Sequence, residues 1–325
     1  GAIQLYQEGI QKLSQDQEPK LWALFHIYLG SALRILGELE SDNLKLEEAI
    51  QAFLKALKEY ERNNASWNRA IAQNSLGTAL AVLGERENDP QKLEQAARAF
   101  QESLTKFPRE RDPIDWATTQ NNLGNVLSLL GQRESGSRRI EEAIRAFRLV
   151  LSEYSQSKVP LKWAMAHNNL GDALRVFGYR ENDTKVLEES VRSFREALKE
   201  FTRVREPLKW GKIQNNLGIA LKCLGDLEDD TQRIEEAVNK FLEALKVRTK
   251  EYVPMQWAIT KNNLGNALRN LGELENGTHR LEEAAIAYKD SLTVFTAEKS
   301  SYYWSETNKN LEMVQEVIAE RKKAQ

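Results

Sequence analysis

The sequence predicts an all-α protein built from repeated antiparallel helix pairs, an α-solenoid. The main observation is a pattern of nineteen residues, Pro207 to Gly225, in which proline, tryptophan and two glycines keep fixed spacings. The pattern recurs every 47 positions along the 325 residues. Periods of this size are typical of stacked helical units. Because the period never slips, we expect one elongated array over residues 1–325 and not separate globular domains.

Three columns of residues, each with the 47-residue spacing, define the repeat. The first glycine column is Gly30, Gly77, Gly124, Gly171, Gly218 and Gly265, and the second is Gly37, Gly84, Gly131, Gly178, Gly225 and Gly272. The tryptophan column is Trp22, Trp116, Trp163, Trp210, Trp257 and Trp304. Glycine within a helix costs about 1 kcal/mol relative to alanine, so the first column predicts close approach of the paired helix. The second column is compatible with a helix C-cap or a kink, and we expect the tryptophans in the core.

Helix boundaries follow from prolines and capping residues. First helices of each pair are expected from about residues 19, 66, 113, 160, 207 and 254, with a closing helix over 301–325. Asp89 and Pro90 form an N-cap followed by proline at the first helical position. The same slot predicts second helices from about 43, 90, 137, 184, 231 and 278. Residues 2–14 match a second helix whose first helix is missing, so we expect an excised fragment of a longer protein.

The two helices of the repeat share a motif, which the sixth copy shows clearly. Its first helix contains Asn262, Leu264, Gly265, Ala267, Leu268 and Gly272, and its second contains Leu281, Ala284, Tyr288 and Leu292. This arrangement resembles the tetratricopeptide repeat, although the ordinary motif has about 34 residues. The chain is similar to an elongated variety found in multi-repeat bacterial proteins, often attached to NTPase or caspase-like effector domains. The resemblance implies a right-handed superhelix with the first helices on its concave wall.

Composition argues against several classes of function. The net charge is -2, from 46 basic and 48 acidic residues, so no overall field favours nucleic acid or a membrane surface. The single cysteine, Cys223, suits a reducing compartment. No targeting segment or long apolar run is present, which favours a cytoplasmic protein. The three histidines are far apart and no catalytic or phosphate-binding motif stands out. We predict a non-enzymatic protein with no cofactor and no metal.

Asparagine is the exception to this plain composition. It is a poor residue for the middle of a helix, yet it forms a doubled column on the first helices, on the side opposite the predicted core. A side-chain amide offers donors and an acceptor and can bind the main chain of a peptide. In the alternative, the amides bridge adjacent first helices and only tie repeats together. The doubled column is Asn121 with Asn122, Asn168 with Asn169, Asn215 with Asn216, and Asn262 with Asn263.

A column of cations accompanies the asparagines. Arg34, Arg175, Lys222 and Arg269 share one slot, beside Lys212 and Asp172. This strip predicts a partner segment with acidic side chains or a free carboxyl terminus. The leading function is a protein-protein interaction module that binds a peptide segment. The alternative is a sensor or regulatory array that controls an attached NTPase or caspase-like domain. The predicted peptide-binding residues are Asn121, Asn122, Asn125, Asn168, Asn169, Asp172, Arg175, Lys212, Asn215, Asn216, Lys222, Asn262, Asn263, Asn266 and Arg269.

Overall fold

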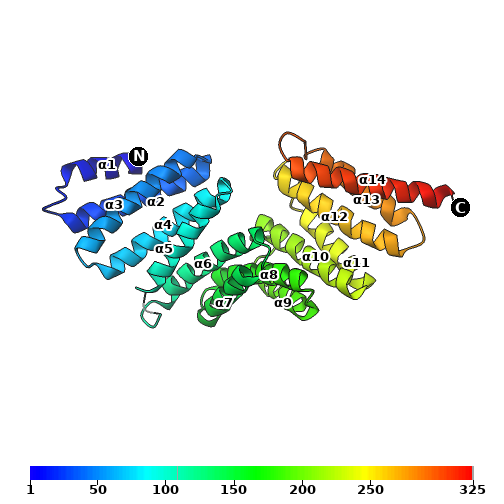
Figure 1. The fold of residues 1–325 in the computed structure, drawn as a ribbon, viewed down its shortest axis with the longest axis horizontal. Helices are drawn as coiled ribbons and strands as arrows, with labels where there is room; N and C mark the ends of the chain where they lie inside the picture. The colour runs from blue at the N-terminus through cyan, green and yellow to red at the C-terminus, as the bar shows by residue number, and fades with distance from the viewer. Residues whose placement is uncertain (108, 324–325) are drawn as a thin grey trace. The chain divides into compact units, whose positions relative to one another are not determined.

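The computed structural model describes residues 1–107 and 109–323, and within these ranges it contains fourteen α-helices and no strand (Figure 1). The first helices of the pairs are α2 (Pro19–Glu40), α4 (Ser66–Arg86), α6 (Pro113–Arg133), α8 (Pro160–Glu181), α10 (Pro207–Glu228), α12 (Pro254–Leu274) and α14 (Ser301–Lys323). The second helices are α1 (Ala2–Lys12), α3 (Asn43–Arg62), α5 (Pro90–Leu104), α7 (Arg138–Glu153), α9 (Thr184–Ala197), α11 (Thr231–Leu245) and α13 (His279–Leu292). The all-α prediction is confirmed, and the predicted end of the closing helix at residue 325 lies outside the described residues.

The local signals placed the helix starts well. Every first helix begins at its predicted residue. Four second helices begin after an aspartate whose carboxylate accepts hydrogen bonds from two backbone N–H groups of the first turn. These N-caps are Asp42, Asp89, Asp183 and Asp230. The two second helices without an aspartate in this slot, α7 and α13, begin one residue later than expected and have no side-chain cap.

The described chain forms two compact units, Gly1–Ser155 and Gln156–Gln325. In each unit, every second helix packs against its own first helix and against the first helix that follows within the unit. Successive first helices also contact one another, whereas no two second helices do so among the described residues. Each unit therefore has a first-helix face, formed where the even-numbered helices lie close together, and a second-helix face, where the odd-numbered helices stand apart.

The first glycine column has the role that the sequence predicts. A Cβ atom added at Gly218 would lie 2.7 Å from Cε1 of Phe241 on the paired helix. The same contact occurs in all six complete pairs, at 2.6 to 2.9 Å from a phenylalanine or tyrosine ring. The ring is buried in every pair, at Phe53, Phe100, Phe147, Phe194, Phe241 and Tyr288. Because glycine has no side chain, the ring can lie directly against the backbone of the first helix.

The second glycine column does not form the helix C-cap, which was one of the two purposes considered from the sequence. A Cβ at Gly225 would lie 2.6 Å from Cγ1 of Ile234 and 3.0 Å from the carbonyl oxygen of Asp230. The helix continues past this glycine to Glu228, and the left-handed residue that ends it is Asp229. The absence of a side chain at Gly225 therefore lets the start of the second helix approach the first helix closely. The first glycine column does the same for the aromatic ring.

The tryptophan prediction requires a correction. The indoles are half-buried, and Trp304 is 41% exposed. Each lies in the first turn of its helix, and Trp163 packs against the edge of the buried core. Trp67 meets the edge of the Phe107 ring, and the guanidinium of Arg109 lies 4.9 Å from the centre of the Trp116 ring. The buried aromatic core comes instead from the second helices.

Candidate peptide-binding face

All of the predicted peptide-binding residues lie on first helices, divided between the two units. Unit 1 contains Asn121, Asn122 and Asn125, on α6. Unit 2 contains Asn168, Asn169, Asp172 and Arg175 on α8, Lys212, Asn215, Asn216 and Lys222 on α10, and Asn262, Asn263, Asn266 and Arg269 on α12. The structure brings the unit 2 residues together, because α8 contacts α10 and α10 contacts α12. Unit 2 therefore holds the larger candidate surface.

Amide hydrogen bonds connect neighbouring first helices in both units. Nδ2 of Asn263 donates to Oδ1 of Asn215 at 3.1 Å, and Nδ2 of Asn122 donates to Oδ1 of Asn74 at 3.5 Å. The register is the same in both cases. The second asparagine of one repeat bonds to the first asparagine of the repeat before it. Part of the asparagine column thus ties repeats together, as one of the two alternatives from the sequence expects.

The two asparagines of a pair have different surroundings. We name the first members in unit 2, Asn168, Asn215 and Asn262, the inner asparagines, and the second members, Asn169, Asn216 and Asn263, the outer asparagines. Asn215 is buried, and its Nδ2 donates to Oδ1 of Asn216 at 3.4 Å. Asn216 and Asn263 are half-buried. Among the described residues, Nδ2 of Asn216 and Oδ1 of Asn263 have no partner, so the outer amides keep hydrogen-bonding capacity toward solvent.

The step between α8 and α10 lacks the amide tie that α10 and α12 share. Nδ2 of Asn168 donates to Oδ1 of Asn169 at 3.1 Å, while Oδ1 of Asn168 is buried with no hydrogen-bond partner in the described chain. By register, Asn216 is the residue that would donate to it. An unfilled buried acceptor costs free energy. This part of the face is therefore the least satisfied in its hydrogen bonds.

The closing helix α14 adds residues that the sequence analysis missed. Oγ1 of Thr307 donates to Oδ1 of Asn262 at 3.0 Å, and Nδ2 of Asn310 donates to Oδ1 of Asn266 at 3.3 Å. The Tyr288 hydroxyl also donates to Oδ1 of Asn266, at 2.8 Å. The carbonyl oxygen of Asn266 is thus occupied within the fold. Asn310 could have been found, since it stands 47 residues after Asn263 in the outer column.

The cations of the predicted positive strip are paired within their own helices. Arg175 lies 2.8 Å from Asp172, and Lys222 lies 2.6 Å from Asp226. Arg269 lies 3.4 Å from Glu273, and its guanidinium donates to Asn310 at 3.0 Å. Lys212 is exposed and has no ion pair among the described residues. The strip therefore carries less net positive charge than the sequence column indicates.

The remaining reactive side chains form no site with these residues. Burial lowers the pKa of His167 and raises the pKa of the Cys223 thiol. The described part of the chain contains no cluster of three or more histidine, cysteine, aspartate or glutamate side chains that could hold a metal ion. In the same residues, no helix combines the length and the apolar character needed to cross a lipid bilayer.

Comparison with known proteins identifies the repeat. Residues 218–320 match the family model of the tetratrico peptide repeat, and the helix pair in that segment is the unit that recurs through the chain. Residues 218–320 are therefore similar to the tetratricopeptide repeat. No curated protein sequence is significantly similar to it.

Several solved structures are similar to this chain. BtubC from P. vanneervenii is 18% identical, with a TM-score of 0.48, over 77% of this chain and 93% of that one. The C-terminal part of a repeat-containing protein from Cytophaga hutchinsonii is 14% identical, with a TM-score of 0.42, over 87% and 95%. The TPR2AB domain of yeast Sti1, in a complex with pHSP90, is 16% identical, with a TM-score of 0.26, over 86% and 98%.

The inner and outer asparagines are expected to respond differently to substitution. Asn215→Ala removes a buried acceptor and leaves Nδ2 of Asn263 without its partner, so we expect a loss of about 1–2 kcal/mol in the free energy of unfolding. Asn216→Ala should be neutral or stabilise by about 0.5 kcal/mol, because alanine is the better helix former. Urea denaturation of the two variants measures the difference. Equal stability of the two would show that the amide ladder contributes nothing.

Proposed function

We propose that the chain is a non-catalytic protein-interaction module whose first-helix face in unit 2 binds an extended segment of a partner protein. The observation that carries this proposal is that the inner and outer asparagines differ in their hydrogen bonds. The inner amides bond within the fold, whereas Asn216 and Asn263 hold unused donors and acceptors at the surface. A row of such groups can pair with the main chain of a segment whatever its side chains are.

The spacing of the outer asparagines supports an extended ligand. They stand at equivalent positions on successive first helices, and packed helices lie about 8–10 Å apart. A strand advances about 3.3 Å per residue, so neighbouring outer asparagines would meet the main chain about every three residues. Exposed Met165 (44%) and half-buried Ile259 stand at equivalent positions on α8 and α12, four residues before Asn169 and Asn263. These side chains would contact alternate residues of the segment.

Charge would contribute less than main-chain bonding. A ligand carboxylate that approaches Arg175, Lys222 or Arg269 competes with the carboxylate that each cation already holds. Lys212 is the cation that can pair with a ligand without such exchange. We therefore propose at most a weak preference for acidic segments or a free carboxyl terminus, and only a modest weakening of binding as the salt concentration rises.

Binding of selected peptides tests the proposal. Peptides chosen from a random library on the wild-type protein should bind an Asn216→Ala, Asn263→Ala variant about tenfold more weakly, which corresponds to about 1.4 kcal/mol. The matched control is Asn239→Ala, at an exposed asparagine on α11, on the other side of the helix pair. It should bind the peptides as the wild type does.

A second arm distinguishes main-chain from side-chain recognition. N-methylation of single backbone amides in a selected peptide should weaken binding at intervals of about three residues, while replacement of single side chains by alanine has smaller effects. Selected peptides that bind the double variant with wild-type affinity, or that tolerate N-methylation at every position, would refute binding through the outer asparagines.

A further inference from the structure

In two repeats a polar pair at equivalent positions links the first helix to its second helix. One member stands four residues before the first glycine column, and the other stands 29 residues later. Nε2 of Gln73 donates to Glu102 at 2.7 Å, and Nζ of Lys261 lies 2.8 Å from Asp290. Glu196 and Glu243 occupy the later position in two other repeats, and Leu149 occupies it in a third. Four of these five repeats thus have a carboxylate on the second helix at this position.

The first complete repeat breaks this rule. Its two positions hold His26 on α2 and Lys55 on α3, so a second cationic group replaces the carboxylate. His26 is 4% exposed, and neither of its ring nitrogens has a hydrogen-bond partner in the described chain. Lys55 is exposed and takes part in no ion pair of the described residues. The carboxylate that four of the other five complete repeats have at this position is missing here.

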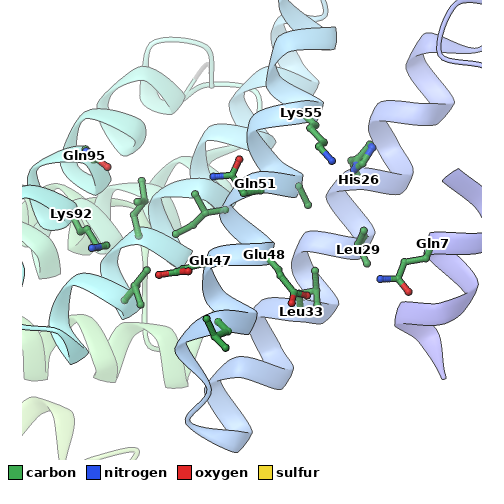
Figure 2. Close-up of a pocket in the computed structure, with 15 residues that line it drawn as sticks. Gln7, His26, Leu29, Leu33, Glu47, Glu48, Gln51, Lys55, Lys92 and Gln95 are labelled. Carbon is green, nitrogen blue, oxygen red and sulfur yellow. The ribbon is translucent and has the colours of Figure 1, made fainter. Parts of the chain in front are cut away.

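Both side chains line a cavity of about 670 Å³ that extends over both sides of α3 (Figure 2). Figure 2 shows Lys55 and His26 pointing toward one another between α2 and α3. Gln7 from α1 and Gln51 from α3 add polar groups, and Leu29 is part of the apolar floor. The volume is within the usual range of ligand sites, about 300–1,000 Å³.

Lys55 is the charged group that acts on His26. From α3, Lys55 and Glu48 line this side of the cavity, and α1 contributes the neutral Gln7. Across α3 the lining includes Glu47 and Lys92. Burial and the charge of Lys55 lower the pKa of His26 to about 4, so the ring is neutral at pH 7 and offers one N–H donor. A carboxylate placed between this donor and the Lys55 ammonium would satisfy both.

We propose that this cavity binds an aspartate or glutamate side chain of a partner polypeptide, with its carboxylate held by His26 and Lys55. The occupant is assigned from four of the other five repeats, where the side chain at the equivalent position carries a carboxylate. Apolar neighbours of the acidic residue would pack on Leu29 and Leu33 of the cavity floor. The site belongs to unit 1, whereas the outer asparagines belong to unit 2, so it stands or falls independently of the proposed function.

Two capped peptides, one with a Leu-Glu-Leu core and one with a Leu-Gln-Leu core, are the probes. The chain has three histidines, so the imidazole signals in nitrogen NMR spectra can be assigned. The acidic peptide should shift the His26 signals and raise the pKa of His26, because a carboxylate beside the ring stabilises imidazolium. The signals of His167 and His279 should not move. The glutamine peptide should bind about tenfold more weakly.

Lys55→Glu supplies the missing carboxylate from the chain itself, as Glu102 and Asp290 do in other repeats. This variant should raise the pKa of His26 in the absence of any peptide and weaken the acidic peptide about tenfold. Lys58→Glu, at an exposed lysine of the same helix outside the cavity, is the matched control and should bind as the wild type does. Lys55→Gln keeps the polar surface and should weaken binding by a smaller factor.

Three results would overturn the proposal. The first is equal affinity for the acidic and the neutral peptide. The second is unchanged binding by both Lys55 variants. The third is an effect of sodium acetate or sodium phosphate on His26 equal to that of the acidic peptide at the same concentration, which would assign the site to a free anion and not to a polypeptide side chain.

Discussion

Phe241→Ala is expected to lower the free energy of unfolding by about 3–5 kcal/mol, because it removes a fully buried ring and leaves a cavity between α10 and α11. In a repeat protein the loss should spread mainly to adjacent helices. Denaturant unfolding measures the total. Hydrogen exchange should show the largest loss of protection in α10 and α11, with smaller losses in α9 and α12, which pack against them.

The control for this prediction is the neighbouring residue. Leu242 follows Phe241 on the same helix and is 47% exposed. Leu242→Ala should therefore cost less than about 1 kcal/mol, since little of its surface is removed from water. A Phe241→Ala effect no larger than that of Leu242→Ala would show that the ring does not hold the pair together.

Gly218→Ala is expected to destabilise the protein by about 1–3 kcal/mol. Intrinsic helix propensity favours the opposite result, since alanine is better than glycine by about 1 kcal/mol within a helix. The deciding contact is the 2.7 Å separation between the new Cβ and Cε1 of Phe241, which forces the buried ring to move. Thermal or urea denaturation gives the sign directly.

A double variant and a second glycine sharpen this test. Adding Phe241→Leu to Gly218→Ala should cost less than the sum of the two single changes, because the smaller side chain makes room for the methyl group. Gly277→Ala places its methyl group where no atom lies within 4 Å, and it should change stability by less than about 0.5 kcal/mol. A Gly218→Ala protein as stable as the wild type would contradict the close-approach explanation of the glycine column.

Part of the candidate surfaces could be predicted from the sequence because it depends on periodicity. The column analysis placed Asn215, Asn216, Asn262 and Asn263 on the side opposite the predicted core; in the structure Asn215 is buried and the other three are half-buried. The partners of each amide could not be predicted. Asn263 and Asn215 are 48 residues apart and lie on different helices. Whether they bond depends on how α10 and α12 are positioned along one another, and packing sets that position.

The tryptophans and the cations show the same limit. Trp210 shares a helical stripe with buried residues, but burial at the first turn of a helix depends on which neighbouring segment covers it. Arg175 belongs to a cation column, but its carboxylate partner, Asp172, lies three residues earlier and bonds to it only in one side-chain conformation. Neither outcome is contained in the spacing of the residues.

For this protein, local chemistry in the sequence determined the helix starts, the period and the close approach at Gly218, because prolines, aspartate N-caps and glycines act within one helix pair. Tertiary structure decided which asparagine ties repeats and which remains at the surface. It also decided that His26, lacking the carboxylate that Glu102 gives Gln73, lines a cavity beside Lys55. These outcomes depend on distances between side chains from different helices, and only the packed units bring those atoms to within hydrogen-bonding reach.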